Sequence, residues 1–168
     1  MEDYEESSQE ILSFVAINLW EIISSKDKPL EKLEKTIEGI SRFFGIEKCS
    51  LMVKDKYGKF IIVASKGIPR KIKDETETCG SKGIADMAIE EKKAIFMKKI
   101  GGVGDKEERN YKTDNFISYP VIINGEVKGV LNLTDKIGER GFSDRDIEAV
   151  KPIVERIKFI LEELFRTR

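Results

Sequence analysis

Histidine is absent from the 168-residue sequence, and cysteine occurs only twice, as Cys49 and Cys79. Histidine is the commonest metal ligand and the side chain most often used as a general acid or base near neutral pH. Its absence therefore removes most catalytic and metal-binding arrangements, including histidine-ligated haem. The two cysteines lie far apart without a Cys-x-x-Cys spacing, which excludes a disulfide framework and predicts reduced thiols. We expect a protein without catalytic activity or a bound metal.

Long apolar runs and an excess of one charge are also missing. No stretch approaches about 18 consecutive apolar residues, and the N-terminal segment Met1 to Glu6 is acidic where a secretory signal would be basic. Lysine and arginine number 30 against 31 aspartate and glutamate, for a net charge of −1. The sequence thus predicts a cytoplasmic protein and gives no electrostatic reason to expect nucleic acid or a membrane as a partner.

The apolar residues that are present, 40% of the chain, suffice for a single domain over residues 1–168 with a core over about residues 8–165. Helical spacing of apolar residues predicts long helices over residues 5–25, 29–44 and 144–165. The last helix has a complete start signal, because Ser143 is a good N-cap, Asp146 follows three residues later, and Phe142 can pack on Ile147.

Strand-like runs alternate with turn signals in the middle of the chain. Residues 49–53 and 60–64 predict a hairpin around Gly58, and residues 116–123 and 126–134 predict another around Asn124-Gly125. A short helix over residues 84–91 and a short strand over 94–97 lie between two long polar loops, residues 65–81 and 98–114. This order predicts an α+β fold, with an antiparallel sheet and helices on one face.

Several segments closely resemble GAF domains. They are Val63-Ala64-Ser65-Lys66-Gly67-Ile68-Pro69, Gly83-Ile84-Ala85, Ser118-Tyr119-Pro120-Val121-Ile122 and Gly125-Glu126-Val127-Lys128-Gly129-Val130-Leu131-Asn132. The resemblance implies a GAF/PAS-like fold with a central antiparallel sheet of five to six strands. The long N- and C-terminal helices would pack on one face, and loops plus short helices on the other. It also implies a regulatory or sensory role.

A further match involves Asp135-Lys136, Phe142 and Asp146, which are similar to the NK, F, DE signature of GAF domains in cyclic-nucleotide phosphodiesterases. Two positions depart from that signature, since Asp135 replaces its Asn and Ile147 its final Glu, and this weakens the case for cyclic-nucleotide binding. We interpret Lys136 and Asp146 as a structural ion pair that ties the end of a strand to the first turn of the last helix.

By the same resemblance, a small ligand such as a nucleotide or metabolite would lie between the sheet and the loops, with no other cofactor implied. The candidate pocket residues are Cys79, Ser81, Lys82, Gly83, Ile84, Phe96, Arg109, Tyr111, Asn115, Ser118 and Thr134. Lys82 and Arg109 are candidates for holding an anion; the alternative is that both are solvated loop charges. Cys79 is a candidate for redox sensing, whereas Cys49 is predicted to be a small core residue.

The first and last helices each have more apolar surface than one sheet needs, which suggests a homodimer. The candidate interface residues are Phe14, Ile17, Trp20, Ile153, Ile160 and Leu164. Our first hypothesis is a sensor that relays ligand binding through dimerising terminal helices to an output domain or partner protein. The alternative is a ligand-free interaction module whose sheet only supports helical dimerisation.

Overall fold

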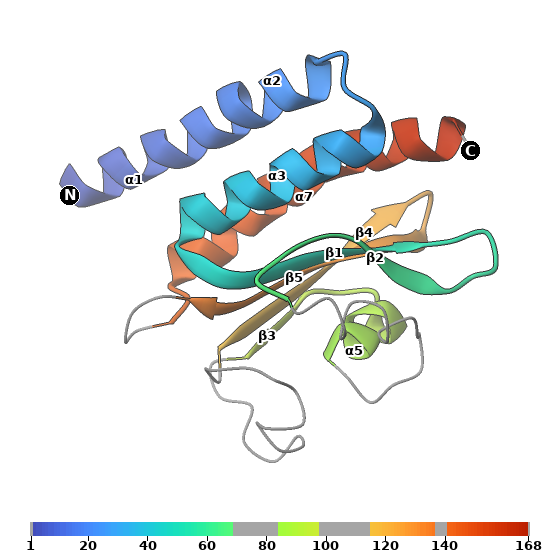
Figure 1. Cartoon of the computed structure of the whole chain (residues 1–168). Coiled ribbons are helices and arrows are strands. Elements are labelled where there is room, and N and C mark those ends of the chain that lie inside the picture. The colour runs from blue at the N-terminus through green and yellow to red at the C-terminus, as the bar shows by residue number, and fades with distance from the viewer. Residues whose placement is uncertain (1, 69–83, 98–114, 137–140, 168) are drawn as a thin grey trace.

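The computed structural model describes residues 2–68, 84–97, 115–136 and 141–167 (Figure 1). Its helices are α1 (Glu2–Ser13), η1 (Phe14–Asn18), α2 (Leu19–Ser24), α3 (Pro29–Phe44), α5 (Ile84–Glu91) and α7 (Asp144–Arg166). Its strands are β1 (Ile46–Lys54), β2 (Phe60–Lys66), β3 (Ile95–Met97), β4 (Phe116–Ile123) and β5 (Glu126–Lys136).

The described strands form one antiparallel sheet in the order β2-β1-β5-β4-β3. Both predicted hairpins are present, as β1–β2 and β4–β5. At the tip of the second hairpin, Asn124 has φ 52° and Gly125 has φ 78°, the left-handed pair that a two-residue hairpin turn requires. The predicted α+β fold with a central antiparallel sheet is therefore confirmed.

The helices divide between the two faces of the sheet, as Figure 1 shows. Helices α3 and α7 lie along one face, and the N-terminal helix lies over them as an outer layer. The main core fills the space between these helices and the sheet, with Ile37 and Ile157 among its fully buried helix residues and Leu51 and Leu131 among those of the strands. The short helix α5 lies on the opposite face.

The N-terminal helix is not the uninterrupted α-helix that its spacing predicts. Over η1 it widens into a π-helical turn, in which the Leu19 amide donates to the carbonyl of Phe14, five residues back. The extra residue per turn shifts the phase of the apolar side chains. Phe14 therefore turns inward and stacks on Phe43 with ring centroids 4.6 Å apart, while Leu12 is exposed. The expectation that Phe14 lies at a dimer interface is wrong.

Helix α7 begins with the predicted capping box. The Asp146 amide donates to Ser143 Oγ at 3.2 Å, and the Ser143 amide donates to Asp146 Oδ2 at 2.8 Å. Further along, Ile153, Ile160 and Leu164 are buried in the chain's own core, so the prediction that they lie at a dimer interface is also wrong. The reason is that α7 packs against the sheet, α3 and α2 at once, which covers both of its apolar stripes.

Candidate functional site

A row of three polar side chains crosses the centre of the sheet. Asn132 of β5 pairs with Ser50 of β1 on one side and with Ser118 of β4 on the other. The neighbours of two of them in the chain, Leu51 after Ser50 and Leu131 before Asn132, belong to the core on the side of α3 and α7. Because side chains alternate between faces along a strand, the three polar residues point to the face away from α3 and α7. We call Ser50, Asn132 and Ser118 the polar row.

The polar row is buried and joined by hydrogen bonds. Ser118 Oγ donates to Asn132 Oδ1 at 2.7 Å, and Asn132 Nδ2 donates to Ser50 Oγ at 3.5 Å. The exposed fractions are 0% for Ser118, 4% for Ser50 and 9% for Asn132. The second amide hydrogen of Asn132 and the hydroxyl hydrogen of Ser50 have no acceptor among the residues that the structure describes. Since buried donors are normally satisfied, the row has hydrogen-bonding capacity left for a further group.

Thr134 and Asn115 extend the polar surface toward the start of α7. The buried Thr134 hydroxyl donates to the backbone carbonyl of Asn115 at 3.1 Å. The Asn115 side chain lies against Gly141, where its amide nitrogen would stand 2.3 Å from an added Cβ atom. Gly141 is two residues before Ser143, the N-cap of α7. A short chain of contacts thus links this face of the sheet to the beginning of α7.

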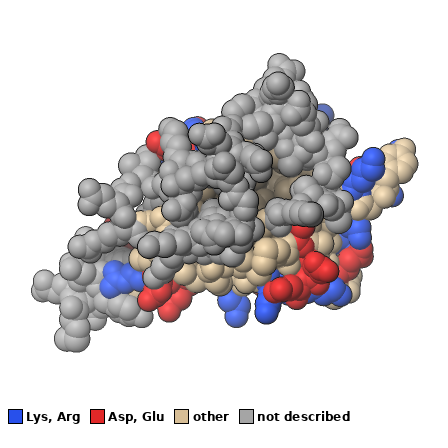
Figure 2. Space-filling model, turned by 90° about the horizontal axis from the view of Figure 1, so that it is seen from below, with Lys and Arg blue, Asp and Glu red and all other residues tan. Residues whose placement is uncertain are grey.

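The other half of the same face is apolar. Helix α5 covers it, and the residues packed there are Met52, Phe60, Ala88, Val127 and Val130. Figure 2 views the molecule from this side and shows acidic and basic side chains of the described residues next to one another at its edge. The described part of the face therefore combines an apolar half with uncharged hydrogen-bonding groups, without a field of a single sign.

The structure describes five of the eleven predicted pocket residues, which are Ile84, Phe96, Asn115, Ser118 and Thr134. Ser118 and Thr134 lie on this face, Ile84 is buried at the start of α5, and Asn115 bonds to Thr134 through its backbone. Six others lie outside the described residues, and their roles stay predictions: Cys79, Ser81, Lys82, Gly83, Arg109 and Tyr111. The side chain of Lys136 is likewise outside the described part, so the ion pair with Asp146 stays a prediction.

Phe96 does not line the predicted pocket. It pairs with Ile117, which belongs to the helix-side core, and residues directly opposite in an antiparallel pair share a face. Phe96 therefore points to the face that carries α3 and α7, where it is exposed at the edge strand. Its neighbour Ile95 pairs with Ser118 and takes the place on the polar-row side.

The predicted site does not include Ser50 and Asn132. Ser50 is aligned with Asn132 through the pairing of β1 with β5, two strands far apart in the chain, whereas the alignment of Asn132 with Ser118 depends on a β-bulge. A two-residue turn at Asn124-Gly125 with regular pairing places Ser118 opposite Leu131. The register instead shifts by one residue between Val121 and Ile122, which brings Ser118 opposite Asn132. Ser118 in β4 and the alternating polar residues Asn132 and Thr134 in β5 are a signal of a polar surface in the sequence. Only the shifted register places Asn132 opposite Ser118.

Cys49 is the core residue that the sequence predicts. Its thiol is buried and donates to the backbone carbonyl of Ile37 at 3.6 Å. Burial raises the pKa of the Cys49 thiol to about 12, so it stays protonated at neutral pH. Among the described residues there is no cluster of three or more potential metal ligands, and no helix is long and apolar enough to cross a membrane.

Comparisons with known proteins agree with this architecture. Residues 31–162 match a family model described as GAF domain, whereas a search of curated proteins finds no match. The fold is similar to the GAF domain of an Acinetobacter phosphoenolpyruvate-protein phosphotransferase, with a TM-score of 0.75 and 17% identity over 94% of this chain and 95% of that chain. The corresponding domain from Coxiella burnetii gives a TM-score of 0.76 and 14% identity over 95% and 97% of the two chains.

An enzyme also shares the fold. The free methionine-R-sulfoxide reductase from Neisseria meningitidis, in complex with its substrate, has a TM-score of 0.68 and 15% identity over 98% of this chain and 92% of that chain. At such identities the likeness shows the fold alone, so these relatives leave the function to be argued from the residues of this chain.

Proposed function

Because its match to the family model covers most of its length, the chain belongs to the GAF domain family, and we propose that it is a non-catalytic regulatory module. In this proposal it binds a small ligand on the sheet face that carries the polar row. It works in the cytoplasm as a homodimer and relays ligand binding through its terminal helices to an output domain or partner protein.

The polar row is the observation that carries the ligand-binding part of the proposal. A sheet that served only as a scaffold would be more stable with apolar residues at these buried positions, because a buried polar group costs free energy unless it is fully hydrogen-bonded. Ser50 and Asn132 instead have donors for which the described part of the chain offers no acceptor, and they lie beside an apolar surface. Apolar walls with a few convergent polar groups are typical of small-molecule sites.

A route from the ligand face to α7 supports the relay. Thr134 bonds to Asn115, the Asn115 side chain fills the space beside Gly141, and Gly141 leads into the capping box of α7. Gly141 has φ 65°, a conformation that fixes the direction in which the chain enters the helix. A ligand that moves Thr134 would therefore change the start of α7 through a few close contacts.

The non-catalytic part of the proposal rests on the side chains present. The chain has no histidine. Cys49, the one cysteine in the described part, is kept in its unreactive thiol form by burial. The groups of the polar row are hydroxyls and an amide, which bind and orient a ligand but are poor acids, bases and nucleophiles without an activating neighbour. The competing expectation is catalytic activity, because the free methionine-R-sulfoxide reductase with a similar fold is an enzyme.

An exposed aromatic patch supports the homodimer. Ile17 is 56%, Trp20 46% and Phe159 49% exposed, and the Arg156 guanidinium lies 5.2 Å from the centroid of the Trp20 ring. We call these four residues the outer patch. The N-terminal segment that supplies Ile17 and Trp20, residues 1–25, has acidic residues in its sequence but no lysine or arginine. A two-fold axis brings the same patch of two copies together, so the acidic helix of each copy can face Arg156 of the other.

The outer patch is also what favours the alternative function, a ligand-free dimerisation module. A thermal-shift screen of nucleotides and metabolites separates the two, with Ser118→Ala as the test variant. Ser41→Ala is the matched control, because Ser41 is also buried and donates to a backbone carbonyl, that of Ile46 at 2.8 Å, but on the helix side.

We expect a compound that stabilises the wild-type protein and Ser41→Ala equally and Ser118→Ala much less. A panel without any stabilising compound, or one that stabilises all three proteins alike, would favour the ligand-free module.

A further inference from the structure

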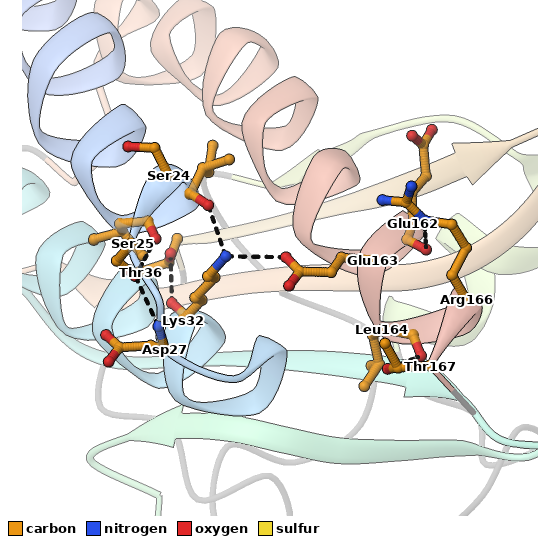
Figure 3. Close-up of polar contacts among 12 residues, drawn as sticks. Ser24, Ser25, Asp27, Lys32, Thr36, Glu162, Glu163, Leu164, Arg166 and Thr167 are labelled. Carbon is orange, nitrogen blue, oxygen red and sulfur yellow. Dashed lines mark hydrogen bonds and ion pairs between the residues drawn. The ribbon is translucent and has the colours of Figure 1, made fainter.

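The ends of three helices meet at one buried ammonium group. Lys32, in the first turns of α3, donates from Nζ to the backbone carbonyl of Ile23 at 2.7 Å and to Glu163 Oε2 at 3.0 Å (Figure 3). Ile23 belongs to the last full turn of α2, and Glu163 lies near the end of α7. We call Ile23, Lys32 and Glu163 the three-helix latch.

The burial of Lys32 is unusual for a lysine. Its side chain is 5% exposed, while that of Glu163 is 34% exposed. A buried ammonium group is costly unless it is paired and hydrogen-bonded, and lysine is almost never fully buried without a partner. The Ile23 carbonyl and the Glu163 carboxylate therefore compensate for the burial of Lys32, and the partly exposed Glu163 is the acceptor that water can replace.

The two hydrogen bonds of Lys32 also join the ends of α2 and α7 to α3. The last carbonyls of a helix have no partner within it, and Lys32 supplies one for the carbonyl of Ile23. At the same time it pairs with a residue 131 positions away in sequence. Helices α2, α3 and α7 also contact one another in pairs. One side chain thus sets the position of two helix ends that belong to opposite termini of the chain.

Stability alone is a weak reason for such a contact, since replacing a buried ion pair by apolar residues is often neutral or stabilising. We propose that Lys32 is a positioning residue that holds the ends of α2 and α7 in one register. When the latch opens, both helix ends are released while the sheet stays folded. The inference concerns helix packing and holds whether or not the sheet face binds a ligand.

Hydrogen exchange of the full chain, followed by mass spectrometry, tests the latch in Lys32→Met. The matched control is Lys35→Met, the same substitution one turn later in α3, where the ion pair with Asp27 is solvent-exposed. A second pair covers the case in which Lys32→Met does not fold, with Glu163→Gln as the test. Glu162→Gln is its control, because the Glu162 side chain makes no hydrogen bond or ion pair with the residues that the structure describes, and only its backbone carbonyl accepts a bond, from Arg166.

We expect exchange of the amides in α2 and in the last two turns of α7 to rise by about tenfold or more in Lys32→Met and Glu163→Gln. Amides of β1 and β5 should stay within about twofold of wild type, and both controls should match wild type throughout. The proposal is overturned if the helix ends keep wild-type exchange in the test variants. It is equally overturned if the sheet accelerates as much as the helices, which would make Lys32 a general stabilising residue.

Discussion

The indole ring of Trp20 lies edge-on against the phenyl ring of Phe159, with ring centroids 6.3 Å apart and an interplanar angle of 87°. The contact joins α2 to α7, and both rings remain about half exposed. Trp20 is the single tryptophan of the chain, so its fluorescence reports on this contact directly. The outer patch is thus both an internal helix contact and, in our proposal, half of a dimer interface.

Substituting a charge into the outer patch should separate the two copies. We predict that Phe159→Glu sediments as a monomer at concentrations where the wild-type protein is a dimer, because each copy would bring a desolvated carboxylate to the interface. Tyr57→Glu is the control, since Tyr57 is 76% exposed and lies in the β1–β2 turn, away from the outer patch. A wild-type protein that is monomeric at high micromolar concentration in analytical ultracentrifugation would remove the dimer from the account.

A side chain at position 141 should be costly. An added Cβ would lie 2.3 Å from the side chain of Asn115, and φ is 65°. We predict that Gly141→Ala lowers the free energy of unfolding in urea by about 2–4 kcal/mol, through steric overlap added to left-handed strain. Gly125→Ala has a similar φ of 78° but nothing within 4 Å, so it should cost only the strain, about 1–2 kcal/mol. Equal losses in the two variants would mean that Asn115 moves away freely and carries no signal to α7.

Stability should depend on Glu126 at acidic pH. Hydrogen bonds from Lys54 and Lys128 lower the pKa of this carboxyl from 4.5 to about 2. Because the folded-state pKa lies below the unfolded value, the stabilisation is fully present above about pH 4.5 and is lost as the pH falls toward about 2. We predict that the difference in melting temperature between wild type and Glu126→Gln shrinks over this interval, as measured by circular dichroism. A constant difference would show that the carboxylate is not paired in solution.

Cys49 should be unreactive in the folded protein. In a Cys79→Ser background, where Cys49 is the only thiol, we predict negligible alkylation by iodoacetamide at pH 8 and complete alkylation in denaturant. The reason is that burial both raises the pKa of the thiol to about 12 and blocks access to it. Rapid modification of the native protein would contradict the placement of Cys49 and reopen the question of redox activity.

The sequence predicted the elements whose signals are local. The capping box at Ser143, the turn at Asn124-Gly125 and the period of α3 each involve residues close in the chain, and the structure has all three. Features that depend on packing between distant elements were not predictable in this way. The apolar stripes of α7 looked like surplus surface, because the sequence does not show that α2 and α3 cover them.

Two local irregularities account for two further differences. The π turn at η1 moves Phe14 into the core, and the bulge after Val121 moves Asn132 opposite Ser118. Each inserts one residue into a regular pattern. In the helix this rotates the positions of the side chains that follow, and in the strand it changes which residues lie opposite one another. A prediction from regular periodicity must fail at such points, and in this chain both lie beside the proposed functional surfaces.

Native mass spectrometry of the purified protein, followed by the same sample under denaturing conditions, tests whether the chain is a dimer that holds a small ligand. It reads the mass of the assembly and of any retained small molecule together. We predict a dimer that carries a defined additional mass, which is released on denaturation and is reduced in Ser118→Ala but not in Ser41→Ala. The contrary result is a dimer without additional mass that no nucleotide or metabolite of the thermal-shift screen stabilises. That result would contradict ligand sensing and leave the dimerisation module as the function.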